Sequence, residues 1–390
     1  MSAPSVAGGS FDIKPVPLSA LTTLRVGGTP TAMTAPVLEA ELVEAARQLW
    51  DSGDPWMLLG GGSNTVAGDE GFDGTVIRIE TRGVEVLPDP AASGRVRLRV
   101  QAGEPWDELV AYTVAQGWSG IEALSGIPGS SGAAPVQNIG AYGQELSSSL
   151  VAVDFLEYES GEIRRVEASE LGLGYRTSVL KRGLEGVVLA IELDLHDTRA
   201  EVAVLGEALS QPVGYSQLAG ALGVQLGDRV PIAALREAVL ALRRSKGMVL
   251  DPTDPDTASA GSFFTNPIVP ETFARALPDS APRWPMGPDL PDRVIPLEEY
   301  AGLSPIPEAE IRRQIKLSAA WLIEKVGISR GFRLPGSRAA VSSKHTLALT
   351  NTGGASAAEI AELARYVQGR VQAEFGLTLR PEPVLVGVVL

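Results

Sequence analysis

Three short segments place an ionisable or hydroxyl side chain in a rigid, apolar setting. Arg176 lies in GYRTSVLK, Ser262 lies in AGSFFTNP, and Glu382 lies between two prolines in LRPEPVLVG. A buried charge is unfavourable unless it is paired or used, so the arginine and the glutamate are candidates for binding or catalysis. Ser262 follows a glycine, and a rigid turn there would present its hydroxyl to a ligand. The structural alternatives are an ordinary ion pair at an edge strand and a serine that caps the start of a strand.

Two glycine-rich stretches, residues 60–64 (GGGSN) and 126–145 (GIPGSSGAAPVQNIGAYGQE), are suited to close contact with a ligand. Glycine permits positive φ and lets the backbone approach a ligand. Successive N–H groups in such loops form a concavity that binds anions. Both loops are therefore candidates for holding a pyrophosphate; the alternative is that they are only tight turns. They match neither common nucleotide motif, because Thr65 stands where the third glycine of G-x-G-x-x-G would follow Gly60, and no G-K-[ST] follows either loop.

The composition excludes several kinds of site. The 390 residues contain no cysteine and only two histidines, which excludes thiolate metal sites, disulfides and cysteine nucleophiles and makes a histidine-based metal centre unexpected. The net charge of -14 disfavours general binding to nucleic acid or anionic membrane, because such a field repels phosphate. No stretch is long and apolar enough to span a bilayer, and the first twenty residues do not resemble a secretion signal. We expect a cytoplasmic protein without a metal.

Hydrophobic periodicity predicts an alternation of helices and strands that would position these segments. Helices are expected at 36–53, at 105–117, in the stretch 199–245, at 307–326 and at 355–376. Strands are expected just before Gly60 and at 74–80, 95–105, 185–195 and 346–351, with a hairpin at 151–167 that turns at Ser160–Gly161. A polar loop is expected to enter a strand at 248–269, and a proline-rich surface segment to span 278–308. Residues 377–390 are expected to form a strand interrupted by Pro381 and Pro383, which mark an edge or a break, because proline cannot donate to a ladder.

Taken in order, the motifs LGGGSN, GIPGSSGAAPVQNIGAYGQE, YRTSVLK, AGSFFTNP and RPEPVLVG resemble those of the UDP-N-acetylenolpyruvoylglucosamine reductases, flavin enzymes of bacterial peptidoglycan precursor synthesis. The glycine loops alone indicate only the broader vanillyl-alcohol-oxidase-like (PCMH-type) FAD fold; the serine and glutamate motifs make the resemblance specific. It implies an α+β fold, with an FAD-binding region in two subdomains, 1–77 and 78–245, and a separate α+β substrate-binding domain at 246–376. The second subdomain would carry a substrate loop at 211–223 and be completed by the C-terminal strand 377–390.

The resemblance also implies ligands and contacts. FAD would bind non-covalently, with NADPH as co-substrate and a UDP-sugar as substrate. The stretch 126–145 would wrap the FAD pyrophosphate and ribityl chain, so that side chains there would collide with the cofactor. The expected cofactor contacts are Gly60, Gly61, Gly62, Ser63, Asn64, Gly126, Ile127, Pro128, Gly129, Ser130, Gly132, Ala133, Gln137, Asn138, Gly140, Ala141 and Tyr142. The expected substrate contacts are Lys246, Asn266 and Tyr215, the last on the loop that would close over the substrate.

The family's catalytic residues fall on Arg176, Ser262 and Glu382. The implied reaction reduces an enolpyruvyl ether with a hydride that passes from NADPH through the flavin. Arg176 would hold the carboxylate on which negative charge develops, Glu382 would be protonated as a result of burial and a neighbouring like charge, and Ser262 would supply a proton. Two alternatives are a flavin-dependent alcohol oxidase of the same fold and a nucleotide-sugar-binding module without turnover.

Overall fold

Short apolar segments around one amphipathic helix form the N-terminal sheet. The computed structural model describes residues 11–88, 94–286 and 314–390. Its first sheet has the strand order β1-β2-β5-β3, and β2 and β3 both run parallel to β5. Helix α1 (Glu39–Ser52) packs Leu42 and Ala46 in one apolar cluster with Ile77, and it ends at Gly53, whose φ of 70° is the left-handed conformation that glycine adopts readily. The strands are β1 (Asp12–Ile13), β2 (Ala32–Thr34), β3 (Trp56–Leu59) and β5 (Thr75–Arg78).

The second sheet is antiparallel and has the order β12-β11-β13-β7-β6, with β8 also paired to β13. Its strands alternate buried and outward residues, as in β7, where Val96, Leu98 and Val100 are buried and arginines lie between them. The expected hairpin is confirmed, because β11 and β12 pair across the turn that contains Gly161. The strands are β6 (Val84–Leu87), β7 (Arg95–Gln101), β8 (Trp118–Ser119), β11 (Leu150–Glu157), β12 (Ile163–Glu167) and β13 (Gly186–Asp197).

Helices and short turns connect this sheet to the rest of the chain. The long glycine-rich stretch contains the 3-10 helix η3 (Ser131–Gln137) and a small hairpin of β9 (Gly140–Ala141) and β10 (Gln144–Glu145). In the segment that follows the sheet, α5 packs Leu235 and Val239 with Leu218 of α4 in a separate cluster. The helices are α2 (Trp106–Ala115), α3 (Arg199–Leu205), α4 (Ser216–Leu222) and α5 (Ile232–Ser245).

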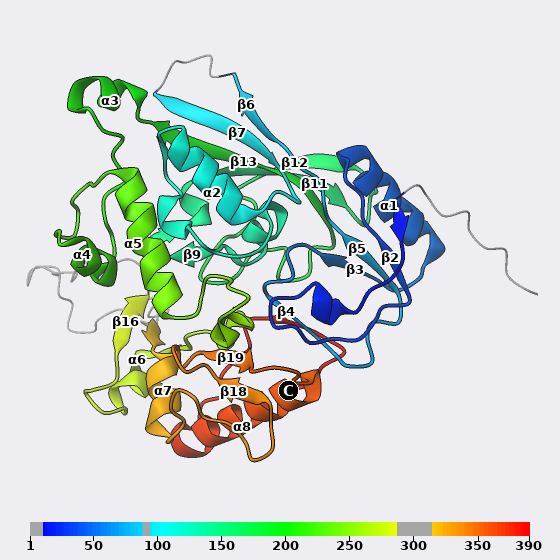
Figure 1. Cartoon of the computed structure of the whole chain (residues 1–390), viewed down its shortest axis with the longest axis vertical. Helices are drawn as coiled ribbons and strands as arrows, with labels where there is room; N and C mark the ends of the chain where they lie inside the picture. The colour runs from blue at the N-terminus through cyan, green and yellow to red at the C-terminus, as the bar shows by residue number, and fades with distance from the viewer. Residues whose placement is uncertain (1–10, 89–93, 287–313) are drawn as a thin grey trace, which may run out of the picture.

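In the described residues of the C-terminal part, two small sheets and three helices lie opposite the second sheet in Figure 1. The sheets are β14-β19-β18 and β15-β17-β16, and α8 starts at a capping box formed by Ser356 and Glu359. The elements are β14 (Ser259–Ser262), β15 (Ile268–Pro270), β16 (Arg283–Met286), β17 (Gln314–Leu317), β18 (Ala339–Val341), β19 (Ala348–Asn351), α6 (Glu271–Arg275), α7 (Ala319–Lys325) and α8 (Ala357–Phe375). This mixture of sheets and helices confirms the α+β class. No helix of the described ranges has the length and apolar character needed to cross a membrane.

The expected helix at 307–326 is wrong over residues 314–317. Residues 314–317 form β17, and the helix begins only after Ser318, whose side chain accepts the N–H of Trp321 and so caps α7. Residues 307–313 lie outside the described residues, as does the stretch 287–308 of the expected proline-rich segment.

The C-terminal strand pairs differently from the prediction. β20 (Val384–Val386) runs parallel to β4 (Thr65–Ala67), directly after the first glycine loop, and does not complete the sheet of region 78–245. The edge of β4 is available because β4 belongs to no other sheet of the described chain. Upstream of β20 in the described structure, Pro381 and Phe264 form an isolated bridge but not a longer ladder. This agrees with the sequence, because Pro381 and Pro383 have no N–H to donate to a ladder. The division into 1–77, 78–245 and 246–376 stays a prediction.

Candidate active site

The two glycine loops contact each other directly. A Cβ on Gly61 would lie 2.6 Å from the Cα of Gly129, and a Cβ on Gly129 would lie 2.7 Å from Ser63 Oγ. The Ser63 hydroxyl donates to the Pro128 carbonyl at 2.9 Å, and Gly129 has a φ of 121°. Packing of the chain on itself therefore already requires these glycines. The contact between the loops is thus a reason for these glycines beside the expected collision with a cofactor, which stays a prediction.

The junction of the loops offers hydrogen-bond donors. Among the described residues no acceptor is found for the backbone N–H groups of Gly61, Gly62, Ser63, Gly129 and Ser130. Backbone donors in a folded protein are nearly always satisfied, so a cluster of open ones marks a place for a ligand or water. Successive N–H groups of this kind bind phosphate groups. The donor set fits the pyrophosphate of FAD, and the cradle lies where the sequence motifs predict it.

A cavity of about 460 Å³ adjoins this cradle, a volume in the range of ligand pockets. Part of its wall is apolar and comes from strands of both N-terminal sheets and from the residue that follows β5: Leu58, Phe155, Val188 and Ile79. Another part is polar and charged, and comes from four distant places in the chain: Arg176, Arg243, Ser262 and Glu382. The three predicted catalytic residues and most predicted cofactor contacts therefore line one cavity.

Arg176 and Glu382 form an ion pair at the charged end. Arg176 Nε lies 3.0 Å from Glu382 Oε1, without the geometry of a hydrogen bond, and Arg176 Nη2 donates to the Gly140 carbonyl at 3.0 Å. The arginine holds this position with a φ of 53°, in the left-handed region that side chains other than glycine rarely adopt. Such strain persists where the surrounding structure enforces it, and it is typical of functional sites.

Backbone pairing brings Glu382 next to Ser262. The Glu382 N–H donates to the Phe263 carbonyl at 2.9 Å, and Thr265 N–H donates to the Arg380 carbonyl at 3.0 Å. Segment 380–382 therefore runs beside the residues that follow Ser262. The Ser262 hydroxyl forms no hydrogen bond within the part of the chain that the structure describes, so it is available to a ligand in the cavity.

Burial dominates the electrostatics of Glu382. The residue is 9% exposed, and desolvation raises the pKa of the carboxyl above its usual range, although Arg176 and Lys181 pull it down. Lys181, which the sequence analysis did not assign, donates to the Glu382 backbone carbonyl at 3.3 Å, and burial lowers its pKa. Asn64 Nδ2 donates to Gln137 Oε1 at 3.0 Å, which ties the two loops together beside this carbonyl.

Tyr215 and Lys246 meet Tyr142 outside the cavity lining. The rings of Tyr142 and Tyr215 pack edge to face with centroids 5.8 Å apart, and Lys246 Nζ lies 5.3 Å from the centre of the Tyr142 ring. Lys246 Nζ also donates to Gln217 Oε1 at 2.8 Å. Asn266 lies elsewhere: its Oδ1 accepts the Ala319 N–H at the start of α7.

Four of the predicted cofactor contacts do not line the cavity: Gly126, Asn138, Ala141 and Tyr142. Asn138 is buried, and its side chain is used by the protein itself. Its Nδ2 donates to Glu145 and to the Gly174 carbonyl, and its Oδ1 accepts the Ser147 N–H. The geometry therefore gives the Asn138 side chain a structural role in the loop, and its contact with a cofactor stays a prediction.

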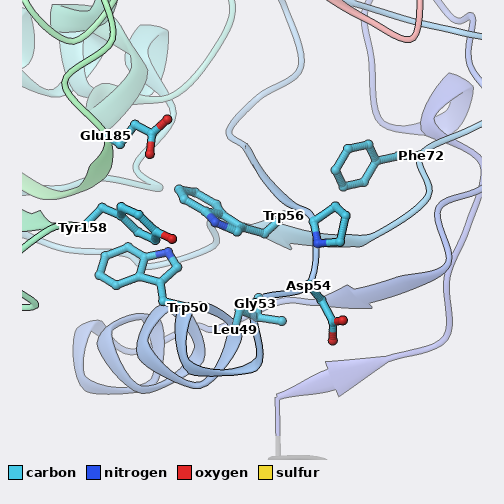
Figure 2. A pocket seen from close by; sticks show the side chains of 9 residues that line it. Leu49, Trp50, Gly53, Asp54, Trp56, Phe72, Tyr158 and Glu185 are labelled. Carbon is cyan, nitrogen blue, oxygen red and sulfur yellow. The ribbon is translucent and has the colours of Figure 1, made fainter.

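A second hollow, of about 470 Å³, contains none of the predicted site residues (Figure 2). It lies where α1 ends and β3 begins, beside Trp50, Trp56 and Tyr158. The ring centroids of these three residues are between 5.1 and 5.9 Å apart, so the rings pack against one another. They join the first sheet to the end of β11.

Comparison with known proteins agrees with this geometry. Two family models match the chain: an FAD binding domain over residues 30–167, and the C-terminal domain of UDP-N-acetylenolpyruvoylglucosamine reductase over residues 251–386. The chain is 62% identical to the UDP-N-acetylenolpyruvoylglucosamine reductase of Leifsonia xyli, over 96% of this chain and 99% of that one. It is 50% identical to the reductase of Saccharopolyspora erythraea, over 96% and 95% of the two chains.

A solved structure shares the fold. The crystal structure of the UDP-N-acetylenolpyruvylglucosamine reductase from Thermus caldophilus matches with a TM-score of 0.60 and 25% identity, and covers 96% of this chain and 100% of that one. The relatives match along nearly their whole length, so the similarity includes both the glycine loops and the charged end of the cavity. The chain therefore belongs to the UDP-N-acetylenolpyruvoylglucosamine reductase family and is an FAD-dependent oxidoreductase.

Proposed function

We propose that this chain uses NADPH to reduce the enolpyruvyl ether of UDP-N-acetylglucosamine to UDP-N-acetylmuramate, a step in the supply of peptidoglycan precursors. The observation that carries this proposal is the single cavity in which two glycine loops meet Arg176, Ser262 and Glu382. The described lining of the cavity does not favour an alcohol oxidase, because an alcohol substrate would not require a half-buried arginine paired with a buried glutamate.

The junction of the glycine loops would hold FAD without a covalent bond. The open N–H groups of Gly61 to Ser63 and of Gly129 and Ser130 would bind its pyrophosphate. The chain has no cysteine for a thioether link, and neither histidine lines the cavity. Bound FAD would accept a hydride from NADPH and pass it to the double bond of the substrate.

Arg176 would hold the substrate carboxylate. A guanidinium is a permanent cation with several donors, and it grips a carboxylate bidentately. Glu382 must then be neutral, because a second bare anion beside the substrate would oppose the negative charge that develops when the hydride arrives. The raised pKa of the buried Glu382 carboxyl favours this neutral form.

Ser262 would protonate the α-carbon. A serine hydroxyl is a weak acid, but the carbanion-like species formed by hydride addition is a strong base, so a well-placed hydroxyl is sufficient. Ser262 lies on β14, which pairs with β19, and the residues that follow it contact segment 380–382. These contacts would hold the hydroxyl at the cavity wall.

Tyr215, Lys246 and Asn266 would contact the sugar nucleotide. The loop 211–223 packs on the turn at Gly143, since a Cβ there would lie 3.0 Å from the Gly214 carbonyl carbon. Lys246 would bring a positive charge to the substrate diphosphate. Residues 246–376 would form the substrate-binding domain, and 1–77 with 78–245 the FAD-binding region.

Product identification tests this proposal. The purified protein, with FAD, NADPH and the enolpyruvyl substrate, should yield a product that carries two more hydrogens, with one NADPH consumed per product. Mass spectrometry of the sugar nucleotide and NADPH absorbance give both values. An unchanged substrate after complete consumption of NADPH would contradict the proposed activity.

A further inference from the structure

Arg243 is the charged residue of the cavity that neither the sequence motifs nor the proposed function accounts for. It lies in the last turn of α5 and lines the same cavity as Arg176, Ser262 and Glu382. Its position continues the buried face of the helix, four residues after Val239 and eight after Leu235. The helix therefore directs this side chain inward, whereas Arg244 beside it is exposed.

The protein supplies almost nothing to balance this charge. Arg243 Nη2 donates to the Met248 carbonyl at 2.9 Å, whereas Nε is buried and has no hydrogen-bond partner in the described structure. No carboxylate among the described residues lies within ion-pair distance of Arg243. The nearby Asp107 is already engaged: its two oxygens bind Arg236 at 2.6 and 3.0 Å, and Oδ1 also accepts the Gly126 N–H.

The guanidinium nevertheless remains a cation. Burial lowers the pKa of Arg243 to about 10, and nearby Tyr142 and Asp107 partly offset that effect, so the charge persists at neutral pH. A partly buried cation with a fully buried, unpartnered Nε and no counter-ion is unfavourable, and such a charge is retained where a bound ligand supplies the opposite charge. The missing partner is therefore an anion that arrives in the cavity.

The position of Arg243 narrows the choice of anion. Its Nε lies 3.3 Å from where a Cβ on Gly126 would stand, at the start of the long glycine stretch, and the nearby cation Arg176 contributes to lowering the pKa of Arg243. The proposed function already pairs the FAD pyrophosphate with the open N–H groups of both loops, and the substrate carboxylate with Arg176. The redox ring of the cofactor must lie at this end too, because Ser262 and Glu382 act on the carbon beside the one that receives the hydride.

We propose that Arg243 is the counter-charge of the reduced flavin, and that its guanidinium faces the pyrimidine edge of the ring at N1 and the C2 carbonyl. This inference rests on the proposed function. A nicotinamide donor delivers two electrons and one proton as a hydride to N5, so the ring gains one negative charge, which is held mainly at N1 and the C2 oxygen. A fixed positive charge at that edge stabilises the reduced form and raises the potential of the bound cofactor.

The test compares R243M with R244M in the FAD-loaded protein, without any turnover. The variants remove the same charge from adjacent residues of one helix, one inward and one exposed. Sulfite adds to flavin N5 and leaves the same negative charge at N1 and the C2 oxygen, so its Kd measures the counter-charge directly. We expect R243M to raise the sulfite Kd at least tenfold, and R244M to leave it within twofold of the unaltered protein.

Equilibration with a redox dye gives an independent readout. At a fixed ratio of oxidised to reduced dye, the ratio of oxidised to reduced flavin should be about tenfold higher in R243M. This corresponds to a flavin potential about 30 mV lower for a two-electron couple. R243Q removes the charge but keeps hydrogen-bond donors in the side chain. If R243M does not retain FAD, the sulfite Kd and the potential are measured on R243Q in its place. An unchanged sulfite Kd and potential in R243Q would overturn the proposal.

Two further outcomes would also overturn it. Weaker FAD binding with an unchanged potential would place Arg243 at the pyrophosphate, and a higher substrate KM alone would place it at the substrate. Failure of the proposed function is a separate result: it would appear in the unaltered protein, as absence of FAD or of turnover.

Discussion

Glu382 is the residue whose chemistry depends most on its surroundings. Two prolines flank it, the backbone pairing of segment 380–382 fixes it, and burial raises the pKa of its carboxyl. In the folded chain the carboxyl therefore holds its proton to a higher pH than in the unfolded chain. The resulting contribution to stability is present at low pH and is lost as the pH rises through the folded-state pKa.

The same shift predicts the pH dependence of the substrate half-reaction. If neutral Glu382 is the active form, the rate of flavin reoxidation by the substrate should fall about tenfold per pH unit above the folded-state pKa of this carboxyl. E382Q keeps a neutral side chain of similar shape and should flatten that limb. Stopped-flow traces measure this rate across the pH range. The same decrease of the rate with pH in E382Q would assign the titration to another group.

Ser262 can be tested apart from the rest of the reaction. S262A should leave reduction of the flavin by NADPH unchanged, because no protein proton is needed in that half. It should slow reoxidation by the enolpyruvyl substrate about 10²–10⁴-fold, the usual effect of losing a general acid. Rapid mixing follows each half separately. Equal losses in both halves would mean that the substitution disturbs the fold or FAD binding.

At this scale the sequence motifs predict Arg176, Ser262 and Glu382 but not their contacts. The pairing of 380–382 with 263–265 joins segments more than a hundred residues apart, which local periodicity cannot reveal. Arg243 was missed because a pair of arginines near the end of a helix is typical of an exposed C-terminus. Its spacing from Leu235 and Val239 was the available signal.

The glycine loops are the elements on which the site depends. Because Gly61 and Gly129 approach so closely, G61A should force the loops apart. Overpacking of this kind costs about 1–3 kcal/mol, so we expect a lower free energy of unfolding and weaker FAD binding. Denaturant unfolding and FAD titration measure both effects.

G369A is the matched control for G61A. Gly369 lies in α8, where a Cβ would meet nothing within 4 Å, so alanine should leave FAD binding unchanged and stabilise the helix by about 0.5–1 kcal/mol. Normal FAD affinity in G61A would show that the loop junction tolerates a methyl group and would remove the reason given for its glycines.

A substitution in the loop 211–223 should change substrate binding separately from the fold and from FAD binding. Tyr215 is 44% exposed, and its ring packs on Tyr142, so Y215F should keep the packing and lose only the hydroxyl. Loss of one hydrogen bond of about 0.5–1.5 kcal/mol corresponds to a substrate KM about 2- to 13-fold higher. Y158F, at the distant aromatic cluster, is the control. An unaltered KM in folded, FAD-loaded Y215F would exclude Tyr215 from substrate contact.

Most elements with clear periodicity were predictable, among them α1, the β11–β12 hairpin and α8. Two errors have physical reasons. The expected helix at 307–326 includes β17, because tertiary pairing with β15 and β16 overrides the helical spacing of Gln314–Leu317. The C-terminal strand pairs with the free edge of β4 and not with the second sheet. The sequence of one strand alone does not determine which distant strand it pairs with.

The whole molecule assembles one cavity from segments that are far apart in the chain. β4, directly after the first glycine loop, pairs with the C-terminal strand, Glu382 lies just before that strand, and the Gly140 carbonyl of the second loop accepts a hydrogen bond from the Arg176 side chain. Apolar side chains of both N-terminal sheets complete the wall. The architecture thus places the donors for a pyrophosphate and the groups for proton and carboxylate chemistry around a common space.

The central claim is that this one cavity carries both halves of the reaction in turn. Sequential anaerobic mixing tests it most directly: FAD-loaded protein is mixed first with NADPH and then with the enolpyruvyl sugar nucleotide, while the flavin absorbance is followed. The account predicts that NADPH bleaches the flavin and that the substrate restores the oxidised spectrum in one turnover. A flavin that NADPH bleaches and the substrate leaves reduced, or a flavin that NADPH does not bleach, would contradict it.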